Sequence, residues 1–258
     1  VLAQLKGGGY RSAANYMSRA KYEHLKLQHV WTDQLAQEAN EGVISTMRGT
    51  GPGHQSAEFP GMKLLDVDIP DIPLEDDFST PLGWTNLAVI ASFFLLREVE
   101  AALMLVGSMV VDTFALTVSV HLPASKADPR ALGCHRSWGC LCGALAAKLC
   151  PYHAAVRQLR LLRDFFGEAG VNDGTPMFPS ILGTALEKCM IVAMIELTIG
   201  LLKMTLTGKD GRPLYGGHAF RVGGARHLAR VGLDVRLIAI LGRWGSDVIL
   251  HYIRDAPP

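Results

Sequence analysis

Charged residues interrupt the longest apolar stretch of this chain, and they limit what it can become. Leu87–Val111 is long enough to cross a bilayer, but it holds three charges between positions 97 and 100. A transmembrane helix needs about 20 mostly apolar residues, and charges inside one are costly. A second apolar run, residues 189–206, carries two charges in an amphipathic pattern. We therefore predict buried helices of a soluble domain and no membrane partner.

The composition provides for a large core. The chain has 258 residues, of which 49% are apolar and 19% charged, which is enough for one large or two modest domains. The net charge of +1 gives no general argument for a nucleic-acid partner. Seven arginines between positions 212 and 254 face only two aspartates, which predicts a basic C-terminal face. An ordinary solvated surface is the alternative.

Apolar periodicity predicts a mainly α fold with a small antiparallel β-sheet, an α+β arrangement. Residues 109–120 partly alternate apolar with small or polar side chains, which favours β-structure. Helical spacing recurs elsewhere in the chain. The expected helices, besides those within 1–50, are residues 85–106, 151–167, 180–206, 218–231 and 234–243.

Glycines, prolines and acidic residues predict a boundary between two domains. Glycine and proline residues are concentrated between positions 48 and 83. Five acidic residues lie between positions 66 and 76, and Lys63 is the only basic residue near them. We expect a helical domain over residues 1–50, a linker over 51–80 and a larger domain over 81–258. Basic side chains in the first domain could contact phosphates or form a solvated face.

Four residues near the C-terminus form the most informative pattern. His218 and Arg221 stand three apart at a predicted helix start, where both side chains point the same way and the helix dipole favours an anion. Trp244 follows, and Tyr252 lies eight positions later (252 − 244 = 8). Arginine suits phosphate because its planar fork pairs bidentately and stays charged. The set predicts a phosphate clamp beside a nucleophile. Taken singly, the residues also fit a surface pair, a core tryptophan and a half-buried tyrosine.

This C-terminal part resembles the catalytic end of the tyrosine recombinases, the integrase family that cuts and rejoins DNA. The segments that carry the resemblance are residues 218–225, 229–233, 238–246 and 252–254. They look most like the variety in DIRS-like and Crypton-like mobile elements of eukaryotes, which commonly have tryptophan where bacterial relatives have a second histidine. The tryptophan-to-tyrosine step is one shorter than in many bacterial and phage members. The resemblance implies a tyrosine-recombinase catalytic domain preceded by a partial helical core-binding domain.

The resemblance also implies two catalytic residues farther upstream. The family has an arginine on a helix with an acidic residue three positions later, and Arg97 with Glu100 fits this pattern. It also has a lysine in a β-hairpin turn, which would be Lys126, as the acid that protonates the leaving 5′ oxygen. Lysine can do this when neighbouring cations and partial burial lower its pKa. A structural Arg97–Glu100 pair and a solvated turn lysine are the alternatives.

The remaining roles follow from the same resemblance. Tyr252 would attack the scissile phosphate and form a 3′-phosphotyrosine link. Arg97 and Arg221 would hold the non-bridging oxygens in the transition state. His218 would assist by hydrogen bonding or proton transfer, and Trp244 would pack at the phosphate. The covalent link conserves the bond energy, so the resemblance implies no nucleotide cofactor and no catalytic metal.

The implied partner is double-stranded DNA, bound by a homo-tetramer. We expect a nuclear location in a eukaryote and a cytoplasmic one otherwise, because no secretory signal pattern is present. Two rival hypotheses stay open. One is a DNA-binding protein of the same fold that no longer cuts. The other is an unrelated helical interaction protein, in which Arg97 would lie away from His218 and Arg221.

A separate group of thiols predicts a metal site. Cys140, Cys142, Cys150 and His153 form a CxC…CxxH pattern, and zinc favours four such ligands in a tetrahedral site. Cys134 is an alternative ligand. The competing interpretation is a set of reduced cysteines in an apolar region, because free cysteine is often buried. An odd total of five cysteines argues against a disulfide scaffold.

Overall fold

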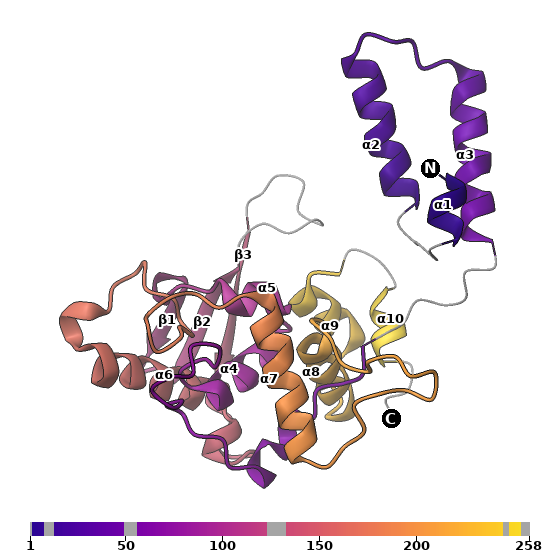
Figure 1. The fold of residues 1–258 in the computed structure, drawn as a ribbon. Helices are drawn as coiled ribbons and strands as arrows, with labels where there is room; N and C mark the ends of the chain where they lie inside the picture. The colour runs from indigo at the N-terminus through magenta and orange to yellow at the C-terminus, as the bar shows by residue number, and fades with distance from the viewer. Residues whose placement is uncertain (1, 8–12, 49–55, 123–132, 245–247, 254–258) are drawn as a thin grey trace. The chain divides into compact units, whose positions relative to one another are not determined.

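The computed structural model of the protein describes residues 2–7, 13–48, 56–122, 133–244 and 248–253. The chain forms two compact units, Val1–Gln55 and Ser56–Pro258 (Figure 1). Among the described residues, no helix combines the length and the apolar character that a membrane crossing requires.

The smaller unit is built from helices. They are α1 (Leu2–Gly7), α2 (Ala13–Lys26) and α3 (Asp33–Met47), and α3 contacts both of the others. Thr32 begins α3, because its Oγ1 accepts a hydrogen bond from the Leu35 N–H at 3.2 Å. Such a cap satisfies one of the backbone donors that the first helical turn leaves unpaired.

The larger unit combines helices with one small sheet. Its elements in chain order are η1 (Gly61–Asp66), α4 (Trp84–Phe93), α5 (Glu98–Ala102), η2 (Val106–Ser108), β1 (Met109–Asp112), β2 (Thr117–Leu122), β3 (Cys134–Gly139), η3 (Ala147–Leu149), α6 (Pro151–Phe166), η4 (Glu168–Gly170), α7 (Lys188–Leu201), α8 (Ala219–Arg230), α9 (Val235–Gly242) and α10 (Val248–Ile253). The predicted fold class, mainly α with a small antiparallel sheet, is confirmed.

The sheet has the order β1-β2-β3 among the described residues, and both pairs are antiparallel. Met109 pairs with Val120, and Leu122 pairs with Cys134. Alternate side chains of β2, namely Val118, Val120 and Leu122, are buried, as expected for a sheet with one face on the core. The sequence pattern predicted β-structure over residues 109–120, which the structure divides into β1 and β2, and it did not predict β3.

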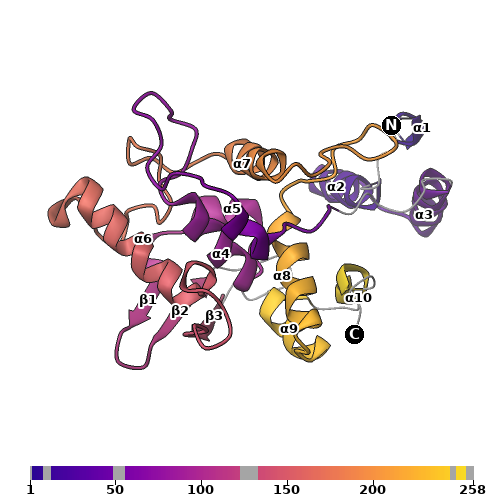
Figure 2. The same ribbon diagram turned by 90° about the horizontal axis from the view of Figure 1, so that it is seen from below.

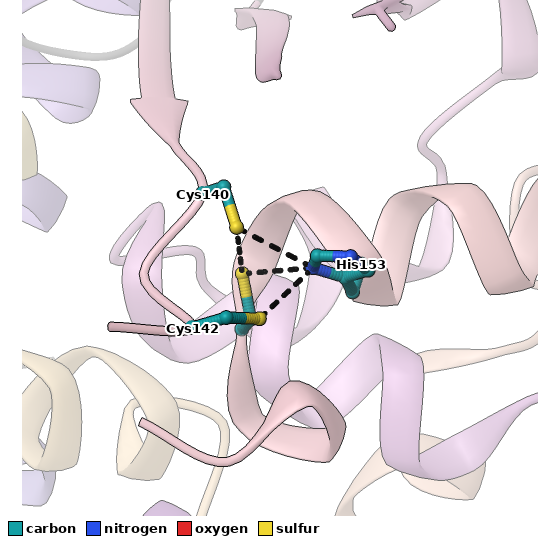
Figure 3. A group of neighbouring side chains, drawn as sticks. Cys140, Cys142 and His153 are labelled. Carbon is teal, nitrogen blue, oxygen red and sulfur yellow. Dashed lines mark hydrogen bonds between the residues drawn. The ribbon is translucent and has the colours of Figure 1, made fainter. Parts of the chain in front are cut away.

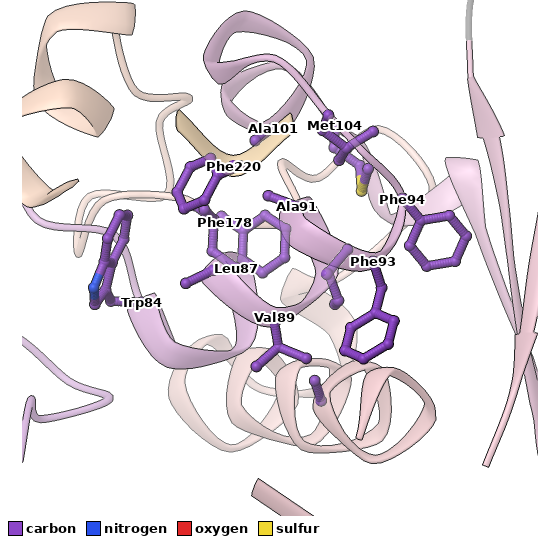
Figure 4. Close-up of a cluster of buried hydrophobic side chains, with 14 of the residues drawn as sticks. Trp84, Leu87, Val89, Ala91, Phe93, Phe94, Ala101, Met104, Phe178 and Phe220 are labelled. Carbon is purple, nitrogen blue, oxygen red and sulfur yellow. The ribbon is translucent and has the colours of Figure 1, made fainter. Parts of the chain in front are cut away.

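The core of the larger unit is organised around α4. Every residue of this helix is buried, and a helix that is apolar all round belongs inside a domain. α4 packs against α6 on one side and α8 on the other, and α6 also contacts the strands (Figure 2). Figure 4 shows the apolar side chains of α4 and its C-terminal turn gathered with Phe178 and Phe220.

The helix expected over residues 85–106 is broken. α4 ends at Phe93, Leu95 adopts a left-handed backbone conformation (φ 52°), and α5 begins at Glu98. The break has a physical cause, because Arg97 precedes α5 as its N-cap and its N–H donates to the Glu100 carboxylate at 2.9 Å. That contact satisfies a helix-start donor and favours a new helix. The helix expected over 180–206 is likewise shorter, spanning only Lys188–Leu201.

Most of the expected linker, residues 56–80, belongs to the larger unit. Phe59 and Leu64 are buried in its core. The Ala57 N–H donates to the Leu214 carbonyl at 2.7 Å, and the Phe59 N–H donates to the Ala219 carbonyl at 3.0 Å. The segment with the acidic and proline residues therefore packs on the core of the larger unit, which begins at Ser56.

Candidate active site

Glu100 lies at the centre of a group of arginines. Its Oε2 accepts from Arg221 Nη2 at 3.1 Å, and its Oε1 accepts from Arg243 Nη2 at 2.6 Å. Arg97 Nε lies 3.7 Å from Oε1. Among the described residues, three guanidinium groups lie against this one carboxylate. The arrangement is suited to binding a further anion.

The environment keeps Glu100 ionised. Burial alone raises the pKa of this carboxyl group. The Arg97 N–H and the charges of Arg221, Arg243 and Arg97 together outweigh burial and hold the pKa below its ordinary value. An ionised carboxylate only accepts hydrogen bonds, so Glu100 orients the guanidinium groups without giving up a proton.

Arg221 is held in place by contacts with the turn after α4 and with α5. It lies in the first turn of α8, its side chain is 5% exposed, and its Nε donates to the Leu95 carbonyl at 2.8 Å. The chain turn after α4 therefore supplies a carbonyl acceptor for this arginine. Arg97 and Arg221, which the sequence places 124 positions apart (221 − 97), meet at the Glu100 carboxylate.

α8 can carry Arg221 there because two glycines let it approach α4 closely. A Cβ on Gly224 would lie 2.0 Å from the Ser92 carbonyl oxygen, and one on Gly223 would lie 2.2 Å from the Phe59 carbonyl oxygen. Such distances are impossible for any other residue, so the pair of glycines determines how deeply α8 is seated.

His218 precedes α8 directly and lies close to α5. The Glu98 N–H donates to the Gly217 carbonyl at 3.1 Å, and the Glu98 carboxylate fills the space of a Gly217 Cβ. His218 is exposed as a whole residue, but partial desolvation of its ring lowers its pKa; Glu98 opposes this shift, and Arg221, Arg97 and Lys188 add to it. A neutral imidazole at pH 7 follows, which can donate at one nitrogen and accept at the other.

Trp244 and Arg243 reach the same place from the end of α9. Arg243 adopts a left-handed conformation (φ 57°), and the Trp244 N–H donates to the Ala239 carbonyl at 3.0 Å. The Arg221 guanidinium carbon lies 5.6 Å from the centroid of the Trp244 ring, within the range of a cation–π contact. Gly242 is required because a Cβ there would meet the Trp244 ring.

Two expected catalytic residues are described only in part or not at all. Tyr252 lies within α10, which contacts α8 and α9, and Ile249 of α10 is buried against Leu228 and Ile238. The Tyr252 side chain lies outside the described part of the structure, as does Lys126, which follows β2 in the sequence.

The sequence analysis missed Arg243. The sequence feature that could have identified it is its position, between Gly242 and Trp244 at the end of a predicted apolar helix. Glu100 was recognised only as the partner of Arg97, because its contacts with Arg221 and Arg243 span more than 100 positions and leave no local pattern.

The cysteines and the histidine of the predicted metal site form a second cluster, separate from the arginines. Cys140 and Cys142 follow β3, Cys150 directly precedes α6, and His153 lies in its first turn. Figure 3 shows Cys140, Cys142 and His153 pointing toward one another. The ligand atoms of all four residues lie within 4.8 Å of one another. Neither Cys134 nor Cys189 belongs to this group.

No protein-family model and no curated protein matches the sequence. Among solved structures, the fold is similar to the XerH site-specific recombinase bound to palindromic difH substrate in a post-cleavage complex. The TM-score is 0.54 at 13% identity, covering 81% of this chain and 52% of that chain. A pre-cleavage complex of XerH with difH substrate gives a TM-score of 0.51 at 13% identity, covering 87% and 62%.

The chain thus spans about half to three fifths of the length of those XerH chains. At 13% identity the likeness concerns the fold. The predicted fold class, mainly helical with a small antiparallel sheet, is confirmed, and the XerH recombinase structures share this fold.

Proposed function

We propose that the protein is a DNA strand transferase of the tyrosine-recombinase type, a site-specific recombinase or integrase. One observation carries the proposal: the Glu100 carboxylate gathers Arg97, Arg221 and Arg243 into one cluster. Phosphoryl transfer spreads negative charge over the non-bridging oxygens of the transition state, and preorganised cations stabilise that charge. In an unrelated helical interaction protein, Arg97 was expected to lie away from Arg221, whereas both contact Glu100.

In the proposed reaction, Tyr252 attacks the scissile phosphorus and the 5′ oxygen of the next nucleotide leaves. The bond to that oxygen breaks as the 3′-phosphotyrosine bond forms, and a 5′-hydroxyl of another strand later reverses the step. Arg97 and Arg221 hold the non-bridging oxygens. His218 is neutral and hydrogen-bonds the phosphate or moves a proton, and Trp244 packs against the Arg221 guanidinium.

Lys126 is the proposed acid for the leaving oxygen. Because the covalent link retains the energy of the phosphodiester, the reaction needs neither a nucleotide cofactor nor a metal at the arginine cluster. The proposed partner is double-stranded DNA, bound by four copies of the chain on two duplexes. Residues 1–50 would supply part of a clamp on that DNA.

The Gly242-Arg243-Trp244 segment favours the DIRS-like and Crypton-like variety of the family, and with it a nuclear location in a eukaryote, or a cytoplasmic one otherwise. By their descriptions, the XerH structures hold a site-specific recombinase bound to its difH substrate before and after cleavage, which supports the proposed class of reaction. The second candidate function is a DNA-binding protein of the same fold that does not cut. It is favoured if the Tyr252 hydroxyl does not reach the cluster.

Covalent capture tests the proposal. The protein is incubated with labelled duplexes from the flanks of its own genomic locus, each nicked so that cleavage releases a short strand and traps the link. Products are separated on a denaturing gel. Tyr252→Phe removes the nucleophile, and Tyr152→Phe is the matched control, because Tyr152 lies on α6 within the core.

We expect a labelled protein band with the wild type and with Tyr152→Phe, and none with Tyr252→Phe. Arg221→Ala should also abolish the band. Retained DNA binding without a band would favour the non-cutting protein. A band that persists in Tyr252→Phe would contradict the assigned nucleophile, and absence of both binding and a band would contradict the proposal as a whole.

A further inference from the structure

We propose that Cys140, Cys142, Cys150 and His153 bind one zinc ion, which ties the end of β3 to the first turn of α6. This inference is independent of the proposed DNA chemistry. It rests on three thiols and one imidazole that the fold brings together from two separate elements.

The spacing of the ligand atoms fits zinc. With about 2.3 Å for Zn–S and about 2.0–2.1 Å for Zn–N, a tetrahedral site puts sulfurs about 3.8 Å apart and sulfur and nitrogen about 3.6 Å apart. The Cys140 and Cys150 Sγ atoms are 3.9 Å apart. The His153 Nδ1 lies 3.7, 3.2 and 3.4 Å from the sulfurs of Cys140, Cys142 and Cys150.

The donor set also selects the metal and the kind of site. Three thiolates and one imidazole are soft ligands that favour zinc over magnesium or calcium. Four protein ligands complete the tetrahedron, which is typical of a structural site and leaves no position for a reacting water. Cys150 is fully buried and Cys142 is exposed, so the ion can enter from the surface.

Neighbouring groups support the ligands as an outer shell. The Leu141 N–H donates to the Cys150 sulfur at 3.2 Å. Arg157 donates to the carbonyls of Ala147 and Lys148 at 2.9 Å each and so fixes the segment that leads into Cys150. Its positive charge lies near Cys150 and Cys142 and complements a site of net charge −1 (2 − 3).

A disulfide or a set of free thiols explains the geometry less well. A Cys140–Cys150 disulfide would use two of the sulfurs and leave Cys142 and His153 converging on nothing. A merely apolar cysteine cluster would not place an exposed thiol 3.2 Å from an imidazole nitrogen.

The ion would fix the sheet relative to the helices of the arginine cluster. Trp138 of β3 donates from its indole Nε1 to the Phe93 carbonyl at the end of α4 at 3.0 Å. Arg136 of β3 donates from Nη2 to the Ile240 carbonyl of α9 at 2.9 Å. Clamping β3 to α6, which itself packs on α4, would stabilise these contacts.

Metal analysis of the full chain tests the proposal. The protein is purified under reducing conditions, its zinc content is measured by mass spectrometry, and the chelator-stripped chain is titrated with cobalt chloride. Visible absorption separates tetrahedral thiolate-bound cobalt from the octahedral ion. Cys142→Ser removes a ligand that is exposed and so costs little packing, and Cys189→Ser is the matched control, an exposed cysteine outside the group.

We expect one zinc per chain and a tetrahedral cobalt spectrum for the wild type and Cys189→Ser. Cys142→Ser should weaken zinc binding by more than the about 10–100-fold that outer-shell changes cost. A chelator should lower the thermal midpoint of the wild type, zinc but not magnesium should restore it, and Cys142→Ser should not respond. Absence of zinc and cobalt binding by a chain with free thiols, an octahedral spectrum, or equal affinity in Cys142→Ser would overturn the proposal.

Discussion

Arg243 donates a hydrogen bond to Glu100 at 2.6 Å, on the carboxylate oxygen opposite the one that Arg221 contacts at 3.1 Å. The two arginine side chains are only 10% and 5% exposed. One carboxylate therefore connects α5, α8 and the end of α9. Because each guanidinium group is oriented by the same acid, a change at Glu100 should disturb the whole cluster.

Glu100→Gln should destabilise the larger unit. Glutamine keeps the shape and an acceptor for the Arg97 N–H, but it removes the negative charge that Arg97, Arg221 and Arg243 share. Removing one partner of a buried ion pair is costly, and we expect a loss of about 2–3 kcal/mol in the free energy of unfolding. Urea unfolding followed by tryptophan fluorescence measures it.

The control for this experiment is Glu168→Gln. Glu168 pairs with Arg163 at 3.5 Å, but its side chain is 82% exposed. An exposed pair contributes little, so this variant should stay within about 0.5 kcal/mol of the wild type. Equal destabilisation by both substitutions would mean that Glu100 has no special role in holding the cluster.

Arg243→Ala should slow strand cleavage. If Arg243 acts with Arg221 on the developing charge, its loss should lower the cleavage rate by about 10²–10³-fold. Arg243→Lys should restore little, because an ammonium group does not reproduce the planar fork. Single-turnover cleavage of the nicked duplex measures both variants.

Arg236→Ala is the matched control, since Arg236 lies on the same helix with an exposed side chain. It should cleave at nearly the wild-type rate. A rate for Arg243→Ala equal to that of Arg236→Ala would show that Arg243 is structural and does not take part in the chemistry.

Local patterns were sufficient to predict much of the fold. Alternation predicted β-structure over residues 109–120, where β1 and most of β2 lie, and the helix expected over residues 218–231 is α8. The break between α4 and α5 was not predictable, because the apolar pattern continues through Phe94–Leu96. There a tertiary contact, Arg221 Nε to the Leu95 carbonyl, stabilises the turn and overrides helix propensity.

The candidate site shows the same division. His218, Arg221 and Trp244 share a recognisable order and spacing, and Cys140, Cys142, Cys150 and His153 lie within one short segment. Glu100 has only Arg97 as a partner close in the sequence, because Arg221 and Arg243 come from α8 and the end of α9. Contacts between residues so far apart in the sequence depend on how closely α8 packs against α4. The spacing of residues along the chain does not predict this distance.

Histidine titration should make the larger unit less stable as pH falls below about 6.5. Burial is the main cause that lowers the folded-state pKa of both His218 and His227. The unfolded chain therefore binds protons first, and stability that is complete above the unfolded pKa is lost as pH falls toward the folded values. Glu100 has a lowered pKa too, and its contribution is lost only below about 4.5.

Urea unfolding between pH 8 and pH 5 measures this dependence. His218→Gln and His227→Gln should each reduce the slope, whereas His29→Gln, an exposed histidine of the smaller unit, should leave it unchanged. An undiminished slope in the His218 variant would contradict the lowered pKa of this histidine.

Two glycine-to-alanine substitutions should change the free energy of unfolding in opposite directions. Gly224→Ala places a methyl group 2.0 Å from the Ser92 carbonyl oxygen and 2.6 Å from a Leu95 methyl carbon, so α8 must move away from α4. Overpacking of this kind costs about 1–3 kcal/mol, more than the about 1 kcal/mol that alanine gains in a helix. Gly200→Ala in α7 meets no atom within 4 Å and should stabilise by about 0.5–1 kcal/mol. Because the Leu95 carbonyl also accepts a hydrogen bond from Arg221, Gly224→Ala should lower the cleavage rate as well as the stability. Gly200→Ala should leave the cleavage rate unchanged. Unfolding and cleavage assays on the two variants, run side by side, check both expectations.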